Sequence, residues 1–132
     1  MYLFKGNTIV PVKILEYIKS GETTDNRVTI IENVVANHYK TTVQDLQINS
    51  KVTPARLMVC FLLFDKLHYG INGIANRYNI YNVYLKDTIR DMYKMTLNDN
   101  KFFALAQDLR GQIETAIQDE ARKSLSKVLF KR

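Results

Sequence analysis

One stretch of this chain predicts a helix that is apolar on nearly every side, and such a helix has to lie inside the fold. The stretch is VTPARLMVCFLLFDKL, residues 52–67. Thr53 is placed to accept hydrogen bonds from first-turn amides, and Pro54 takes the first helical position, where its missing N–H costs nothing. Other elements are needed to cover this helix from several directions. The sequence therefore predicts a domain built around it.

Helical patterns occur on both sides of this central helix. Before it, Thr29 and Glu32 form a capping box at the start of a helix that continues to about Tyr39. A second capping pattern, TVQD at residues 42–45, begins a shorter helix. After it, we expect Gly70 to end the central helix. No internal repeat or strand-rich region is evident, so we expect an all-α fold.

A long helix is expected from about Asn100 towards the C-terminus. Gly111 interrupts its pattern at a cost of about 1 kcal/mol relative to alanine, and it is a candidate for a bend. The apolar positions in step along this helix are Phe103, Ala106, Leu109, Ile113, Ile117, Ala121 and Leu125 or Val128.

Residues 1–27 differ from the rest of the chain. They contain a short β-prone start, YLF and TIV, then a helical pattern after Pro11 and a polar loop. We expect an N-terminal extension over residues 1–27, which packs on the main domain or mediates contacts, and a helical domain over residues 28–132.

Composition excludes several classes of protein. The chain has 132 residues, of which 46% are hydrophobic and 24% charged, so one domain with a real core is expected and wholesale disorder is not. The longest apolar run, residues 57–64, is too short to span a membrane, and no membrane partner is expected. The start of the sequence lacks the pattern of a secretory signal, so we expect a cytoplasmic protein.

The sequence offers little to catalysis. Cys60 lies inside the apolar run and is expected to be a small core residue, while His38 and His68 have no metal-binding spacing. Candidate nucleophiles lack a nearby base, and no Gly-x-x-x-x-Gly-Lys-Ser/Thr motif occurs. We therefore expect no enzyme, no metal site and no cofactor.

The positive charge is concentrated at the C-terminus. The chain carries a formal charge of +6, and residues 121–132 contain no acidic residue. This basic tail can approach phosphate, or it can be a solvated helix end at which cations suit the helix dipole. Charge alone leaves both interpretations open. The tail consists of Arg122, Lys123, Lys127, Lys131 and Arg132.

Residues 70–95, GINGIANRYNIYNVYLKDTIRDMYKM, have the pattern of a helix-turn-helix. Asn79 occupies the turn, where a residue that tolerates positive φ is needed. The inward positions are Ile71, Ile74, Ala75 and Tyr78 on the first helix, and Leu85, Ile89 and Met92 or Met95 on the second. The outward positions of the second helix are Asn82, Tyr84, Lys86, Asp87, Arg90, Asp91 and Lys94.

These outward side chains allow two interpretations. Asparagine pairs well with adenine, and arginine and lysine pair well with guanine, so the face is suited to the major groove. Alternatively, the aspartates neutralise the neighbouring cations through close pairs along an ordinary surface helix.

From about residue 28 to residue 114 the chain resembles the C-terminal DNA-binding domain of DnaA, the bacterial replication initiator. The similar segments are IIENVVANHYKTTVQDL, SKVTPARLMVCFLL, GINGIANRYN and KFFALAQDLRGQI. The family's base-contacting motif is not retained in NIYNVYLKD, and the basic loop is shorter. The resemblance implies a DnaA-like helical bundle with a helix-turn-helix, extended here by an N-terminal segment and a long basic C-terminal helix.

We therefore expect a non-enzymatic protein that binds double-stranded DNA with full or partial sequence specificity, in replication or transcription control. Phosphates would be held at a helix N-terminus by Lys51, Thr53 and Arg56. Bases would be contacted by Tyr81, Asn82, Tyr84, Lys86 and Arg90.

The alternative function is a protein-interaction or scaffold module that keeps the helical core without binding DNA. The eight tyrosines suit either function, because tyrosine is common at protein interfaces and also contacts phosphate. A homodimer or another protein partner, bound through the N-terminal extension or the C-terminal helix, is compatible with both functions.

Overall fold

The computed structural model describes residues 25–48 and 51–130, with side chains up to Leu125. In this part of the chain the regular structure is helical and contains no strand, which confirms the all-α class. The β-prone start and the helical pattern after Pro11 lie outside the described residues. The helices are α2 (Asn26–Tyr39), α3 (Val43–Ile48), α4 (Pro54–Leu67), α5 (Ile71–Tyr78), α6 (Asn82–Asn98) and α7 (Asn100–Phe130).

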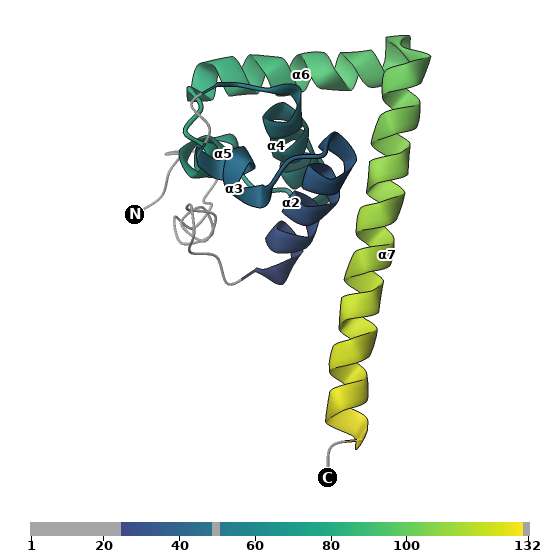
Figure 1. The fold of residues 1–132 in the computed structure, drawn as a ribbon. Helices are drawn as coiled ribbons and strands as arrows, with labels where there is room; N and C mark the ends of the chain where they lie inside the picture. The colour runs from purple at the N-terminus through teal and green to yellow at the C-terminus, as the bar shows by residue number, and fades with distance from the viewer. Residues whose placement is uncertain (1–24, 49–50, 131–132) are drawn as a thin grey trace, which may run out of the picture.

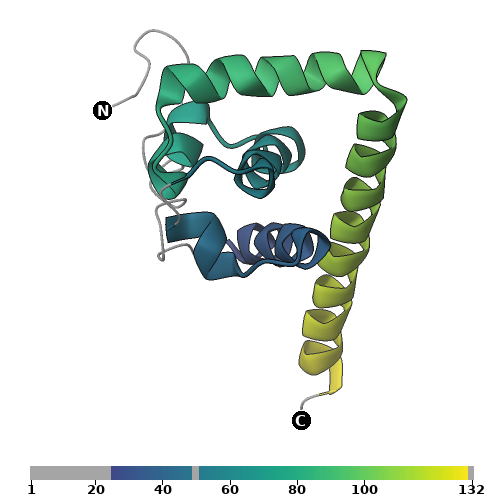
Figure 2. The ribbon, with the colours of Figure 1, turned by 45° about the horizontal axis from the view of Figure 1, so that its top comes forward.

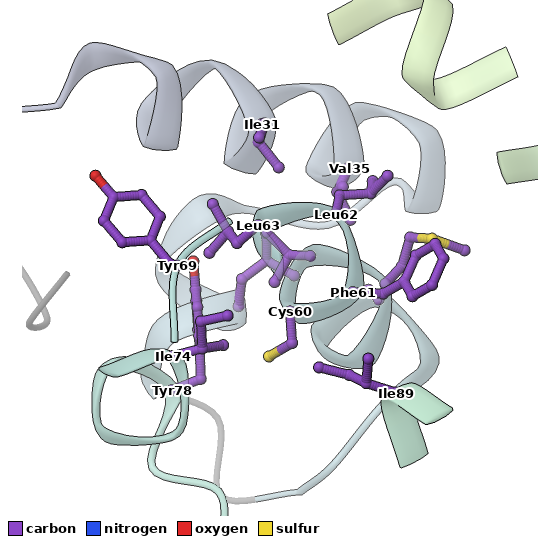
Figure 3. Close-up of a cluster of buried hydrophobic side chains, with 14 of the residues drawn as sticks. Ile31, Val35, Cys60, Phe61, Leu62, Leu63, Tyr69, Ile74, Tyr78 and Ile89 are labelled. Carbon is purple, nitrogen blue, oxygen red and sulfur yellow. The ribbon is translucent and has the colours of Figure 1, made fainter. Parts of the chain in front are cut away.

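Helix α4 lies at the centre of the domain, as the sequence predicts. Its residues 58–63 are at most 1% exposed. Figure 3 shows Ile31 and Val35 of α2 packed on one side of α4, while Ile74 of α5 and Ile89 of α6 lie on the opposite side. The buried thiol of Cys60 points towards this second side, which confirms its expected place in the core.

The start of α4 is also as predicted. Thr53 Oγ1 accepts a hydrogen bond from the Arg56 amide at 3.2 Å, and Pro54 is the first helical residue. The capping pattern at Thr42 is confirmed as well, because its hydroxyl accepts from the Asp45 amide at 3.1 Å.

Two predicted helix ends are wrong. Helix α2 begins at Asn26, with Asp25 as its N-cap, so Thr29 is inside the helix and the capping box with Glu32 does not form. Helix α4 ends at Leu67, because His68 adopts a left-handed conformation with φ of 61° and closes the helix with its own N–H. Gly70 instead precedes α5 as its N-cap residue.

Helices α6 and α7 form two adjoining sides of a frame around α2–α5 (Figures 1 and 2). Helix α7 is continuous through Gly111, so the glycine does not interrupt the helix. Its buried positions Ala106, Leu109 and Ile113 agree with the predicted stripe, and Ile117 is partly buried.

The first position of the predicted α7 stripe is wrong. Phe103 is 45% exposed, and the neighbouring Phe102 packs against Phe61 instead, with 6.2 Å between the ring centroids. At the start of α7, next to α6, the buried face of the helix is therefore shifted by one residue relative to the predicted stripe. None of the helices in the described part of the chain is long and apolar enough to cross a membrane.

Candidate nucleic-acid interface

A three-residue turn joins α5 to α6. Asn79 adopts the left-handed conformation predicted for it, with φ of 55° and ψ of 52°. Ile80 follows with its amide bonded to the Ala75 carbonyl at 3.0 Å and its side chain buried, which anchors the turn in the core. Helix α6 then begins at Asn82, with Tyr81 as its N-cap residue. The turn thus sets the direction of α6 relative to α5.

Helix α6 has the two faces that the sequence predicts. Leu85, Ile89 and Met92 are buried, whereas Met95 is 40% exposed, so the apolar stripe ends at Met92. Every predicted outward residue is exposed. These residues are Asn82, Tyr84, Lys86, Asp87, Arg90, Asp91 and Lys94.

Two contacts organise the exposed side chains near the turn. The side-chain amide of Asn82 donates to Asn72 Oδ1 at 2.9 Å, which ties the first turn of α6 to the first turn of α5. Arg90 forms an ion pair with Asp87 at 2.8 Å, and both side chains are more than half exposed. Residues 82–98 hold three cations and two aspartates, so this surface has only a small positive excess. The exposed surface of α6 can therefore bind a polyanion only in an orientation that keeps Asp87 and Asp91 away from the phosphates.

Arg56 does not lie at the surface, so the prediction that its side chain holds phosphate is wrong. It is only 1% exposed. Its guanidinium donates to the main-chain carbonyls of Leu46 and Lys51, each at 2.8 Å, and to that of Tyr78. Arg56 therefore fastens α3, the loop before α4 and the end of α5 to one another from inside.

Helix ends explain why a buried guanidinium is tolerated there. Leu46 belongs to the last turn of α3 and Tyr78 is the last residue of α5, and the final carbonyls of a helix lack partners within the helix. These carbonyls also carry the negative end of the helix dipole. Two helix C-termini thus offset the charge of Arg56, and among residues 25–48 and 51–125 no carboxylate forms an ion pair with it.

A second buried polar cluster joins α5 to α2 and α3. Arg77 and Glu32 form an ion pair at 2.9 Å, and each side chain is 2% exposed. The Tyr78 hydroxyl donates to Glu32 Oε2 at 2.6 Å, and the Gln47 amide reaches both carboxylate oxygens at 3.2 Å. The cluster joins α2, α3 and α5, and so it fixes α5 and the turn after it.

The environment of this cluster perturbs its titration. Burial and the nearby Glu32 carboxylate raise the pKa of Tyr78 well above its ordinary value, so the phenol stays protonated and remains a donor. Burial likewise raises the pKa of Cys60, which makes this thiol a poor nucleophile.

Sequence reasoning missed both buried clusters. The sequence suggests a capping-box role for Glu32, although its position between Ile31 and Val35 also fits the inward face of α2. Arg77 directly precedes the inward Tyr78, yet nothing in the sequence links it to a residue 45 positions away. Position on a helix could have indicated that these residues are buried, but not which partners they meet.

The other predicted phosphate contacts are only partly suited to that role. Lys51 is exposed, whereas Thr53 is half-buried and already occupied as the N-cap of α4. A hollow of about 270 Å³ lies beside this N-terminus and is lined in part by Asp45. A carboxylate in that position repels phosphate, so Lys51 is the better-placed of the two predicted contacts.

The basic tail lies apart from the start of α6. Arg122 and Lys123 are exposed near the far end of α7, whereas Asn82 begins α6 at the opposite corner of the frame (Figures 1 and 2). Arg122 is also paired with Asp119 at 3.0 Å. The side chain of Lys127, and residues 131–132, lie outside the described part. The described tail residues and the outward face of α6 therefore do not form one continuous basic surface.

The described residues hold no group of three or more His, Cys, Asp or Glu side chains that could bind a metal ion. No protein family, curated protein or solved structure matched this chain. Its function must therefore be inferred from its own residues.

Proposed function

We propose that this chain is a non-enzymatic protein that binds double-stranded DNA through a helix-turn-helix formed by α5, the turn at residues 79–81, and α6. The observation that carries the proposal is the exposed outward face of α6 beside a turn that is fixed from within. Pre-organised side chains lose less entropy on binding than mobile ones, so a rigid mount favours specific contacts. The DnaA-like pattern of the sequence supports this proposal and, with it, a role in replication or transcription control.

In this proposal the first two turns of α6 enter the major groove. Asn82 exchanges its bond to Asn72 for a base edge, and Lys86 and Arg90 reach guanine or phosphate. Tyr81 and Tyr84 contact phosphate or a thymine methyl. Lys51 contacts the DNA backbone beside the turn, because Arg56 holds the Lys51 and Tyr78 carbonyls close together.

The role of Arg56 changes accordingly. It is a positioning residue, which holds the turn and the loop at Lys51 in fixed relation, and it does not touch DNA. Phosphate contacts are then fewer than the sequence predicts, so binding should depend less steeply on salt.

The experiment is selection from a random DNA pool with the full chain, followed by anisotropy titrations of selected and scrambled duplexes. Arg90→Ala has a matched control in Arg122→Ala, because each arginine is exposed and paired with an aspartate three residues before it. We expect Arg90→Ala to reduce discrimination by about 1–3 kcal/mol and Arg122→Ala to leave the ratio of affinities unchanged. A chain that retains no duplex even at about 50 mM salt, where phosphate contacts are strong, would refute the proposal.

A second candidate function is supported by the apolar character of the same corner. Tyr81 is 72% exposed and Val83 53% exposed at the start of α6, and Ile48 is 73% exposed at the end of α3. Arg56 bonds to the Leu46 carbonyl in α3 and to the Tyr78 carbonyl, which lies three residues before Tyr81. Exposed apolar side chains are typical of protein interfaces where they gather into one patch. If the chain binds no duplex in the titration above, this corner becomes a candidate site for a protein partner.

A further inference from the structure

The exposed face of α6 is divided between two rows of side chains. Residues four apart on an α-helix are neighbours on its surface, because 3.6 residues complete one turn. One row, which we call the cation row, consists of Asn82, Lys86, Arg90 and Lys94. The other, which we call the acid row, begins one residue later and consists of Val83, Asp87, Asp91 and Met95. All of these side chains are exposed, so the two rows share the outward face.

The two rows lie on different flanks of the helix. Each residue turns an α-helix by about 100°, so the acid row lies about 100° further round than the cation row along its whole length. Tyr93 is partly buried at one edge of the buried stripe of α6, where its hydroxyl donates to Asp65 of α4 at 2.7 Å. Thr88 is partly buried at the other edge. By this geometry the cation row borders the Tyr93 edge, and the acid row borders the Thr88 edge.

Most of the charge on the cation row is available to a partner. Arg90 is paired with Asp87, which lies in the acid row. Lys86 and Lys94 form no ion pair with any other residue among 25–48 and 51–125. These two lysines are eight residues apart, or about 12 Å along the axis at 1.5 Å per residue. The cation row is therefore positive over about 12 Å of the helix, and the acid row beside it is negative.

The major groove would place a phosphate backbone beside each flank. This groove is about 12 Å wide, and a helix with its side chains is about 10–12 Å across, so each flank of a bound helix faces one strand. Helices α2–α5 lie on one side of α6 and α7 lies at its end, which leaves the outer side of α6 open (Figures 1 and 2). One strand would then attract the cation row, and the other would repel the acid row.

We propose that α6 binds duplex DNA off-centre, with the cation row against the phosphates of one strand and the acid row facing the other strand at a greater distance. Lys94 then contacts phosphate, together with Lys86 and Arg90. This inference rests on the proposed function, because it specifies how α6 lies in the groove. It explains how a helix that carries two aspartates on its outward face can approach a polyanion.

The test replaces single phosphates of a selected duplex by neutral methylphosphonates, one position and one strand at a time, and measures binding of the full chain by anisotropy at about 50 mM salt. We expect replacements beside the cation row to weaken binding about twofold to fivefold, because each removes an exposed charge contact. Replacements beside the acid row should strengthen binding, because each removes a repulsion. Equal weakening from both strands, or no effect from either, would overturn the inference and leave DNA binding intact. A chain that binds no duplex would overturn the proposed function and the inference with it.

Variants assign each effect to its row. Lys94→Ala should remove the weakening at one or two positions of the strand beside the cation row, whereas Lys123→Ala, an exposed lysine near the far end of α7, is the matched control and should leave the pattern unchanged. Asp87→Asn with Asp91→Asn should abolish the strengthening and keep the weakening. Identical patterns for the two lysine variants would overturn the assignment of the cation row. Strengthening that persists without the two carboxylates would overturn the assignment of the acid row.

Discussion

The guanidinium of Arg56 donates a hydrogen bond to the main-chain carbonyl of Tyr78, the last residue of α5. Tyr78 directly precedes the turn at residues 79–81 that leads to α6. The same guanidinium holds the Lys51 carbonyl at 2.8 Å, so one side chain fixes both the turn and the loop before α4. An arginine expected at a DNA-binding surface thus acts inside the protein, on the placement of the segments that form that surface.

Arg56→Met should destabilise the domain. Methionine fills a similar length but cannot donate, so the Leu46 and Tyr78 carbonyls lose their donor in a buried site and the Lys51 carbonyl loses its donor in a partly buried one. Each unsatisfied buried group costs about 1–3 kcal/mol, so we expect a loss of about 3 kcal/mol or more in the free energy of unfolding. Urea denaturation followed by circular dichroism measures this loss.

A different outcome would restore the interpretation based on the sequence. If Arg56→Met unfolds at the same urea concentration as the wild type but loses affinity for all duplexes equally, Arg56 contacts phosphate. Lys51→Ala is the companion variant, because it removes an exposed cation nearby and should weaken DNA binding without this loss of stability.

The sequence predicts best those features that depend on neighbours along the chain. The apolar run at residues 57–64 required a central helix, and the exposed face of α6 followed from its helical spacing. Asn79 followed from the conformation that its turn requires. Each of these depends on local geometry, which the order of residues determines.

The features that it missed depend on tertiary contacts. Glu32 meets Arg77 45 positions later, and Arg56 meets Tyr78 22 positions later. A capping box and a phosphate site were reasonable interpretations of Glu32 and Arg56 because each residue type is common in those roles. In the folded protein Glu32 and Arg56 instead bind buried partners that are distant in the sequence.

The start of α2 should make the stability of the domain sensitive to acid. Burial alone would raise the pKa of Asp25, but hydrogen bonds from Arg27 and from the Tyr69 hydroxyl, at 2.5 Å, lower the pKa below its ordinary value of 3.8. A lowered pKa means that the folded state favours the carboxylate, so its contribution is complete above 3.8 and is lost as the pH falls further. We expect the stability of Asp25→Asn to fall less steeply than that of the wild type over this range, as measured by urea denaturation at a series of pH values.

Tyr69, whose hydroxyl donates to Asp25, provides a control at the opposite end of the pH scale. Burial and the bond to Asp25 raise the pKa of Tyr69 to about 12. Its contribution is therefore lost as the pH rises from 10 through 12, and Tyr69→Phe should remove that alkaline loss. Identical acid profiles for the wild type and Asp25→Asn would show that Asp25 is not held in this way.

Gly111→Ala should stabilise the domain. The glycine lies inside the continuous helix α7, and a Cβ added there would meet nothing within 4 Å. Alanine is favoured over glycine in a helix by about 0.5–1 kcal/mol, and thermal unfolding should shift upwards accordingly. A downward shift would mean that α7 bends at Gly111 in solution, as the sequence had indicated.

The aspartates on the outward face of α6 should limit non-specific binding to DNA. Asp87 pairs with Arg90 at 2.8 Å, and Asp91 lies on the same exposed surface. Exposed pairs of this kind contribute about 0.5 kcal/mol or less, so Asp87→Asn with Asp91→Asn should leave the fold intact. Near phosphate each aspartate is repelled, so the double change should raise affinity for scrambled duplexes several-fold at low salt and lower the ratio of specific to non-specific binding. Anisotropy titrations measure both affinities.

Asp119→Asn is the matched control, because Asp119 makes the same kind of pair with Arg122 at the far end of α7. It should leave DNA affinity nearly unchanged if α6 alone enters the groove. If the Asp87/Asp91 variant instead loses its selected site while non-specific affinity stays constant, one of these carboxylates accepts a hydrogen bond from cytosine, and its role is to select sequence. If neither affinity changes, α6 does not touch DNA. Its tyrosines and Val83 are then candidate contacts for a protein partner.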